Sequence, residues 1–229
     1  MIRTEPAPAK INLALHVTGR RADGYHLLDS LVVFTALGDR VTVAPGPASL
    51  SVTGPFADAV PAGEDNLCLR ALRRVGAEAT VTLDKHLPPA SGIGGGTADA
   101  AAVLRGLGVT VERPETLGAD LPACLLSRPL RMQGVGERIT PVNLPDLHLV
   151  LVNPRVETPT PAVFAALDHR DNASLPDLPA LPDAAALVGW LADTRNDLQP
   201  PALGLRPVIA DCLAALSAQG AELARAARG

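Results

Sequence analysis

Aromatic residues are scarce in this chain of 229 residues, which has one tryptophan, one tyrosine and three phenylalanines. Hydrophobic residues nevertheless make up 47% of the sequence, so valine, leucine and alanine must build the core. The length allows one large domain or two small ones. Each of the few aromatic side chains therefore carries more information about function than it would in an ordinary sequence.

Cysteine is also rare. The three cysteines, Cys68, Cys124 and Cys212, are odd in number, widely spaced and set in apolar stretches. This pattern argues against a disulfide or metal framework and predicts buried, reduced thiols in a cytosolic protein. Four histidines show no metal-ligand spacing with the cysteines and are predicted to be structural or surface residues: His16, His86, His148 and His169. We assign no residue to a metal.

An excess of positive charge and a long apolar run are both absent. Twenty Lys and Arg against twenty-four Asp and Glu give a formal net charge of -4, so no general basic field recruits nucleic acid or an anionic membrane. No uncharged apolar stretch reaches the ~20 residues of a membrane span, and the N-terminus has no apolar signal core. We expect a cytoplasmic protein that binds neither nucleic acid nor membranes and holds anionic ligands with local groups.

The most informative segment is the run from Leu87 to Ala102, in which four glycines and small hydroxylated residues lead into an alanine-rich helix. Glycine permits positive φ and close approach, and the helix adds N–H donors and the positive end of its dipole. Such a turn suits a nucleotide triphosphate. The run lacks the lysine of the Gly-x-x-x-x-Gly-Lys-Ser/Thr loop and the Gly-x-Gly-x-x-Gly order. A tight strand-to-helix connection is therefore an equal alternative on composition alone.

Hydrophobic periodicity indicates an α+β or mixed α/β protein with a mixed sheet. The proline-rich residues 172–183 cannot form a regular helix or a central strand, so they are predicted to be an ordered surface connection, with a flexible linker as the alternative. A turn at Asn143 to Asp146 predicts domains 1–144 and 145–229. The expected strands are 11–17, 31–34, 40–43, 80–83 and 147–152, and the expected helices are 66–75, 97–106 and, broken at Gly220, 207–228.

Two N-terminal blocks, Pro8 to Leu15 and Gly19 to His26, add weight to the glycine-rich run. In this order the motifs make the chain resemble the GHMP small-molecule kinases from about Pro8 to Arg225. Within that family it is most similar to members that phosphorylate a hydroxyl of a cytidine diphosphate derivative in non-mevalonate isoprenoid synthesis. Further matching motifs are Glu64 to Leu67, Gly118 to Pro122, Gly134 to Glu137, Pro159 to Pro161 and Arg195 to Leu198.

The resemblance implies a two-domain architecture, with a ribosomal-protein-like N-terminal domain that binds ATP and a ferredoxin-like C-terminal domain. It implies Mg²⁺ bridging the β and γ phosphates, with the Thr97 hydroxyl nearest the metal. The family commonly has two serines where this chain has Thr97 and Ala98, so one hydroxyl is lost. The residues implied to wrap the phosphates are Pro88, Pro89, Ala90, Ser91, Gly92, Ile93, Gly94, Gly95, Gly96, Thr97 and Ala98.

The resemblance also assigns Lys10 and Asp120 to catalysis. Asp120 would accept the proton of the substrate hydroxyl, while Lys10 would hold Asp120 ionised and neutralise charge on the transferred group. From the residues alone, Lys10 would be a solvated strand-end cation, and Asp120 would be a helix N-cap before Leu121 and Pro122.

Further ligand contacts are implied by matching positions. Asn66 matches a residue that reads adenine, although it suits a helix N-cap equally well, and Lys85 is placed near the nucleotide. Tyr25 and Phe164 match aromatic positions on the two faces of a cytosine, and His26 matches a residue at the base edge. Phe164 alternatively belongs to a core helix face. The implied acceptor-site residues are Asn12, Tyr25, His26, Thr160, Pro161 and Phe164.

The family normally continues into a third glycine-rich motif after the helix that here runs to Arg225, whereas this sequence stops at Gly229. We expect either a kinase that works without this segment or a truncated nucleotide-binding protein with little catalysis. A sugar or a mevalonate-like alcohol is the alternative acceptor, against which the pair Tyr25 and Phe164 argues.

Overall fold

The computed structural model describes residues 1–227 and combines a mixed sheet with helices, which confirms the expected α+β class. The strands are β1 (Arg3–Arg20), β2 (His26–Ala44), β3 (Ser49–Thr53), β4 (Thr80–Asp84), β5 (Leu130–Gly134) and β6 (Arg138–Pro141). The α-helices are α1 (Leu67–Val75), α2 (Gly95–Leu107), α3 (Leu121–Leu126), α4 (Thr160–Ala165), α5 (Ala184–Ala192), α6 (Gln199–Leu205) and α7 (Val208–Ala218), and short 3₁₀ turns occur at Ala57–Ala59 and Pro114–Thr116.

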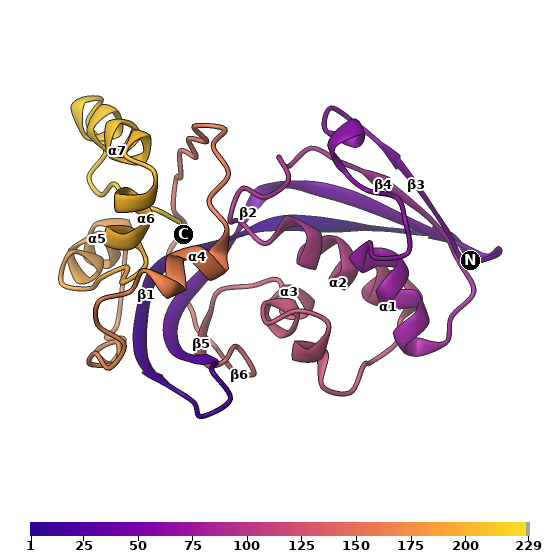
Figure 1. Cartoon of the computed structure of the whole chain (residues 1–229), viewed down its shortest axis with the longest axis horizontal. Coiled ribbons are helices and arrows are strands. Elements are labelled where there is room, and N and C mark those ends of the chain that lie inside the picture. Colours follow the sequence, from indigo (N-terminus) through magenta and orange to yellow (C-terminus); the bar gives the residue numbers. More distant parts are fainter. Residues whose placement is uncertain (228–229) are drawn as a thin grey trace. The chain divides into compact units, whose positions relative to one another are not determined.

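The two long strands, β1 and β2, lie side by side and pair with each other (Figure 1). β2 also pairs with β4 and β5, so it is the central strand of the sheet. The turn between them is closed by the Arg21 N–H, which donates to Tyr25 O at 2.8 Å. Residues 40–44 of β2 pair antiparallel with β4, and residues 28–32 pair antiparallel with β5. β3 adds parallel to β4, and β6 adds antiparallel to β5.

The expected strands 31–34 and 40–43 are parts of the single strand β2. Gly38 lies between them, and a Cβ atom at this position would come within 2.6 Å of Ala7 O. Glycine therefore permits close approach of the β1 backbone at this point, and the strand continues where the sequence suggested an interruption.

The chain divides into two compact units whose residues interleave. Unit 1 comprises Met1–Lys10 and Phe34–Arg128, and unit 2 comprises Ile11–Val33 and the chain from Pro129 onward. Each of the two long strands contributes one part to each unit. The predicted boundary between residues 144 and 145 is a different division and stays a prediction.

Unit 1 packs α1, α2 and α3 against one side of its strands (Figure 1). The buried face of α2 consists largely of alanines, with Val103 and Leu104, and these small side chains bring the helix close to the sheet. A Cβ atom on Gly106 would lie 2.8 Å from Val43 Cγ2, so this approach requires glycine. The expected core of valine, leucine and alanine is confirmed.

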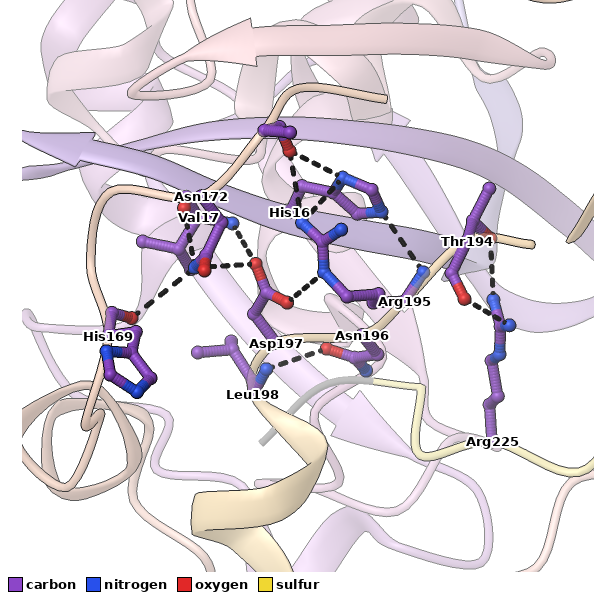
Figure 2. A network of polar contacts seen from close by, with 11 residues as sticks. His16, Val17, His169, Asn172, Thr194, Arg195, Asn196, Asp197, Leu198 and Arg225 are labelled. Carbon is purple, nitrogen blue, oxygen red and sulfur yellow. Dashed lines mark hydrogen bonds and ion pairs between the residues drawn. The ribbon is translucent and has the colours of Figure 1, made fainter. Parts of the chain in front are cut away.

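Unit 2 has a smaller apolar cluster, to which β1, β2, α4 and α6 contribute Leu15, Leu28, Val163 and Ala202. Beside it, the Arg195–Leu198 segment runs along β1 and forms a network of polar contacts (Figure 2). Residues 172–183 contain no helix or strand, as their prolines predicted.

The expected strand at residues 147–152 is wrong. This segment has no ladder partner among residues 1–227, and Val150 is 74% exposed. Its apolar, β-branched composition fits a strand, but a strand also requires a neighbouring backbone, which composition does not reveal.

The last helix is shorter than expected. α7 ends at Ala218, Gly220 follows with φ +88°, and the described tail is not helical up to residue 227, while Arg228 lies outside the described residues. Instead, the Arg225 guanidinium donates to Leu191 O at 2.5 Å and to Thr194 O at 2.7 Å, which holds the tail near the end of α5.

In residues 1–227 no single helix is long and apolar enough to cross a membrane; α6 and α7 satisfy the criterion only together, as a pair bent by 119°. The three cysteines are free thiols, of which Cys68 and Cys124 are buried as expected. Cys212 is only half-buried, because α7 buries none of its side chains completely.

Candidate active site

The glycine-rich segment connects β4 to α2 and lines a cavity of about 330 Å³ in unit 1. Every residue from Pro88 to Thr97 contributes to the wall. Ala98, which was expected to belong to the same site, is buried within α2, and its N–H donates to Gly94 O at 2.9 Å. Gly94 is the N-cap of α2, so the cavity wall ends in the N–H donors of a helix N-terminus.

The backbone of this loop adopts the left-handed region at alternate residues. Ala90, Gly92 and Gly94 have φ values of 54°, 72° and 70°. Alternation of left-handed and other residues turns successive N–H groups toward one side, which makes a concave site for an anion. The loop therefore has the backbone geometry that phosphate binding requires, and not only the composition.

Lys10 and Asp120 come together against this loop. The Lys10 side chain is fully buried, and its Nζ lies 3.4 Å from Asp120 Oδ1. The Lys10 N–H donates to Ile93 O at 2.9 Å, and a Cβ on Gly94 would lie 3.3 Å from Lys10 Cβ. The lysine is thus no solvated strand-end cation, and the loop backbone lies directly on its aliphatic stem.

Asp120 does occupy the N-cap position of α3. Within the described residues, however, its side chain makes no capping hydrogen bond to this helix. It is 7% exposed and faces the lysine instead. A buried ion pair is weak evidence for stability, because desolvation offsets much of the attraction. A carboxylate beside an ammonium is, however, well suited to remain ionised.

Only two of the twenty basic residues are lysines, and both are buried in unit 1. Lys85 lines the cavity, and its Nζ donates to Asp39 Oδ2 at 2.6 Å and to Asp99 Oδ2 at 2.7 Å. The other Asp39 oxygen accepts the N–H groups of His86 and Leu87 at 2.6 and 2.7 Å. This cluster ties the end of β4 to the first turns of α2.

Burial lowers the pKa of Lys85, but the neighbouring carboxylates of Asp99 and Asp39 raise it more, so that its pKa lies above its usual value. Burial also raises the pKa of Asp99 to about 7, against the opposing effect of Lys85. Sequence reasoning missed Asp39 and Asp99. A signal was available for Asp99, which is the one charged residue in an alanine run, Ala98 to Ala102.

Asn66 immediately precedes the first residue of α1 and also lines the cavity. Its Oδ1 accepts the Cys68 N–H at 2.9 Å, and its Nδ2 donates to Pro61 O at 2.7 Å. The helix N-cap is therefore confirmed, while the adenine contact stays a prediction.

The predicted acceptor residues lie in unit 2. His26 stacks on Phe164 with ring centroids 4.7 Å apart and an interplanar angle of 20°. Tyr25, in the preceding turn, is 63% exposed. Thr160 and Pro161 are the first two residues of α4, the helix that carries Phe164. Phe164 follows them by about one helical turn.

Phe164 also packs partly against the apolar cluster of unit 2, so its core role and its stacking role coexist. Burial lowers the pKa of His26, and the positive charges of Arg20 and Arg170 lower it further. The imidazole is therefore neutral near pH 7 and presents one donor and one acceptor nitrogen. Asn12 is buried in the sheet, where its Nδ2 donates to Ser30 Oγ at 2.7 Å.

These arrangements define two chemical capacities. Unit 1 holds a concave array of N–H donors next to a buried lysine and carboxylate, and unit 2 holds a neutral imidazole stacked on a phenyl ring. The first suits an anion and a group that must lose a proton, whereas the second suits a planar ring.

Comparison with known proteins agrees with this chemistry. A family model described as GHMP kinases N terminal domain matches residues 66–127. The chain is 64% identical over 225 residues to a 4-diphosphocytidyl-2-C-methyl-D-erythritol kinase of Paracoccus denitrificans, covering 97% of this chain and 82% of the relative. It is 56% identical over 232 residues to the protein of the same name in Cereibacter sphaeroides, covering 96% and 84%.

Solved structures are similar too. A crystal structure of 4-(cytidine 5'-diphospho)-2C-methyl-D-erythritol kinase matches with a TM-score of 0.70 and 35% identity, covering 96% of this chain and 84% of that one. A homoserine kinase from Cytophaga hutchinsonii matches with a TM-score of 0.54 and 18% identity, which supports the fold alone.

Proposed function

Because this chain belongs to the 4-diphosphocytidyl-2-C-methyl-D-erythritol kinases of the GHMP kinase family, we propose that it transfers the γ-phosphoryl group of ATP to the 2-hydroxyl of 4-diphosphocytidyl-2-C-methyl-D-erythritol. This is a step of the non-mevalonate route to isoprenoid precursors. The observation that carries the proposal is the buried ion pair of Lys10 and Asp120, which lies directly against the glycine-rich loop.

In the proposed reaction the acceptor oxygen attacks the γ-phosphorus, its proton passes to the Asp120 carboxylate, and ADP leaves. Phosphoryl transfer depends mainly on positioning and on neutralising charge in the transition state. Lys10 has two roles in this step. Its ammonium holds Asp120 ionised, and it offsets negative charge on the transferred group. Its burial excludes water, which would otherwise weaken both effects.

The nucleotide is proposed to bind with its phosphates on the loop N–H groups between Gly92 and Thr97. Asn66 and Lys85 border the same cavity and are assigned to the nucleoside end. Pro88, Pro89, Ala90, Ser91, Ile93, Gly94, Gly95 and Gly96 complete the wall. Ala98 supports the loop from within α2, because its N–H fixes the Gly94 carbonyl.

The residues of this cavity also fit a magnesium ion that arrives on the nucleotide. In residues 1–227 no group of three or more His, Cys, Asp and Glu side chains forms a metal cage, and Mg²⁺ bound through substrate phosphates needs few protein ligands. Thr97 supplies the hydroxyl that would hold it. When bound, the ion offsets the negative charge of the β and γ phosphates.

The acceptor is proposed to bind in unit 2 through its cytidine, with Tyr25 and Phe164 contacting the base faces and His26 its edge. Because the His26 ring is stacked on Phe164 in this structure, the imidazole must turn away from the phenyl ring when the base binds. Aromatic stacking contributes roughly 1 to 3 kcal/mol per base. Thr160 and Pro161 shape the same site, and Asn12 is assigned to the diphosphate or polyol end.

We place the protein in the cytoplasm with a small molecule as its partner. Its three cysteines are free thiols, which supports a reducing compartment. Its net charge of -4 supports the exclusion of nucleic acid and membranes as partners.

The decisive experiment measures ADP release from ATP with Mg²⁺ and the cytidine diphosphate substrate, and locates the new phosphate by ³¹P NMR. Asp120→Asn should lower kcat by about 10²- to 10⁴-fold, because it removes the proton acceptor. Asp58→Asn, on the exposed 3₁₀ turn, is the matched control and should leave kcat unchanged.

Circular dichroism should first establish that all three proteins are folded. Nucleotide binding without any turnover in the unsubstituted chain would instead indicate a binding protein with little catalysis. Faster turnover of an alcohol without a cytidine group would indicate another acceptor, and equal kcat values for Asp120→Asn and the unsubstituted chain would refute the assignment of Asp120.

A further inference from the structure

Two arginines of unit 2 are held next to the residues of the aromatic stack. Arg20, the last residue of β1, donates from Nε to Gly24 O at 3.2 Å, across the turn that carries Tyr25. Arg170 donates from Nη2 to Ala165 O at 3.3 Å, at the end of the helix that carries Phe164. Each guanidinium is therefore bonded to a backbone carbonyl of a sequence neighbour of Tyr25 or Phe164.

Neither guanidinium has a carboxylate within ion-pair distance in residues 1–227, unlike nearby arginines of the same unit. Arg21 pairs with Asp23 at 2.6 Å, and Arg195 pairs with Asp197 at 2.8 Å. The charges of Arg20 and Arg170 instead act on His26, whose pKa they lower in addition to burial. His26 is therefore subject to two positive charges that no acidic side chain of the described chain neutralises within ion-pair distance.

One polar atom of the stack and one of Arg170 also lack hydrogen-bond partners in the described chain. Arg170 Nε and His26 Nε2 are both buried, and neither has a partner. Buried polar atoms in folded proteins are nearly always hydrogen-bonded, because leaving such an atom without a partner destabilises the folded state. Unpartnered polar atoms on a cation and on the imidazole that its charge acts on are expected where a ligand supplies the missing partners.

We propose that Arg20 and Arg170 form an anion subsite that binds the phosphate groups carried by a nucleoside whose base contacts the aromatic side chains of Tyr25, His26 and Phe164. Guanidinium groups present planar pairs of N–H donors that match phosphate oxygens, and such charge-assisted bonds are stronger than neutral ones. The inference rests on the proposed function, in which the acceptor is a cytidine diphosphate derivative. It adds two specificity residues that select the phosphorylated nucleoside over the free one.

The test compares the binding of CDP and cytidine to the full chain by calorimetry. The unsubstituted chain should bind CDP more tightly than cytidine, and rising salt should reduce this preference. Arg170→Gln and Arg20→Gln should each weaken CDP binding about 10-fold or more, as expected for a lost charged hydrogen bond, and leave cytidine binding unchanged. Arg170→Lys, which keeps the charge, should recover part of the loss.

Arg206→Gln is the matched control, since Arg206 is another arginine of unit 2 that donates to backbone carbonyls, those of Glu157 and Leu205. It should change neither affinity. In steady-state assays the same Arg170 and Arg20 variants should raise KM for the acceptor while KM for ATP and kcat stay unchanged. This split separates substrate binding from a general structural defect.

Equal losses of CDP and cytidine affinity in Arg170→Gln and Arg20→Gln would overturn the subsite, because these arginines would then support the base or the fold and not the phosphates. Unchanged CDP affinity in both variants, or an unsubstituted chain that binds CDP no better than cytidine, would overturn it as well. Absence of turnover in a chain that binds CDP as predicted would refute the kinase alone, because calorimetry measures the subsite without catalysis.

Discussion

At the scale of single residues, one missing Cβ atom sets the distance between the glycine-rich loop and Lys10. Gly94 has φ +70°, and a Cβ built on it would lie 3.3 Å from Lys10 Cβ and 3.5 Å from Lys10 Cε. The 3.3 Å contact requires the lysine stem to shift by a few tenths of an ångström. Because the stem carries the ammonium that faces Asp120, a methyl group at position 94 should disturb the ion pair without touching either charge.

Gly94→Ala is therefore expected to lower kcat on the order of 10- to 100-fold, the usual effect of misplacing a catalytic group by up to 1 Å. Gly76→Ala is the matched control. Gly76 has φ +62°, so alanine costs a similar ~1–2 kcal/mol of backbone strain, but a Cβ there meets nothing within 4 Å. Stopped assays of kcat, together with urea unfolding of both variants, separate positioning from strain.

Repeating the Gly94→Ala substitution in a Lys10→Met variant tests whether Gly94 acts through the lysine. If Gly94 acts through the lysine, adding Gly94→Ala to Lys10→Met should not lower kcat further. Equal kcat losses in the Gly94 and Gly76 variants would show instead that strain alone matters.

Single residues also show which parts of the site could be predicted from the sequence. Lys10 and Asp120 are found from their motifs, although their side chains meet across 110 residues of sequence. The cluster of Asp39, Lys85 and Asp99 was not found, because its hydrogen bonds join residues 46 and 14 positions apart. Such contacts depend on how β4 and α2 pack, which no local pattern encodes.

At the scale of elements, the Arg195–Leu198 segment behaves as a short additional partner of β1 (Figure 2). The Leu15 N–H donates to Arg195 O at 2.9 Å, and the Asp197 N–H donates to Leu15 O at 2.8 Å. The next residue is the buried His16, whose Nε2 accepts the Arg195 N–H at 3.0 Å. The other ring nitrogen therefore carries the proton and donates to Ala173 O at 2.9 Å.

This arrangement accepts only a neutral imidazole, because a proton on Nε2 would face the Arg195 N–H. Burial accordingly lowers the pKa of His16 below its ordinary value of 6.5. A lowered pKa means that the unfolded chain binds the proton more readily, so the contribution of His16 to stability is present above pH 6.5 and is lost as the pH falls. The loss has a limiting slope of about 1.4 kcal/mol per pH unit.

We expect the free energy of unfolding of the unsubstituted chain, relative to that of His16→Gln, to decrease between pH 7 and pH 5. Urea unfolding at each pH measures it. Taking the difference removes the titration of His26 and Asp99, which is common to both proteins. A difference that stays constant with pH would mean that His16 tolerates its charge in the folded state.

The elements themselves were predicted unevenly. α1, α2 and β4 lie within one or two residues of their expected bounds. The two helices have glycine or asparagine at both ends, and β4 alternates buried and half-buried residues. The failures at residues 147–152 and at the end of α7 have different causes. The segment 147–152 has a strand-like composition but no neighbouring strand among the described residues. After α7, Gly220 adopts φ +88° and the tail is held by the backbone bonds of Arg225, a long-range contact that composition does not reveal.

At the scale of the whole molecule, the two units share their longest strands. β1 passes from unit 1 to unit 2 after Lys10, and β2 passes back after Val33. Neither unit can unfold completely without breaking the ladder between these strands. We therefore expect the chain to unfold as one cooperative body, in contrast to two domains joined by a single flexible linker.

The single tryptophan makes this expectation measurable, because Trp190 lies on α5 in unit 2, whereas the proposed ATP cavity lies in unit 1. A non-hydrolysable ATP analogue at 100 times its Kd stabilises the folded state by about 2.7 kcal/mol. For a chain of this size, Trp190 fluorescence should then report a Tm increase of roughly 5 to 10 °C. Circular dichroism, which averages over both units, should show the same increase. If unit 2 unfolds independently, the Trp190 transition will keep its Tm while circular dichroism resolves a second, ligand-dependent step.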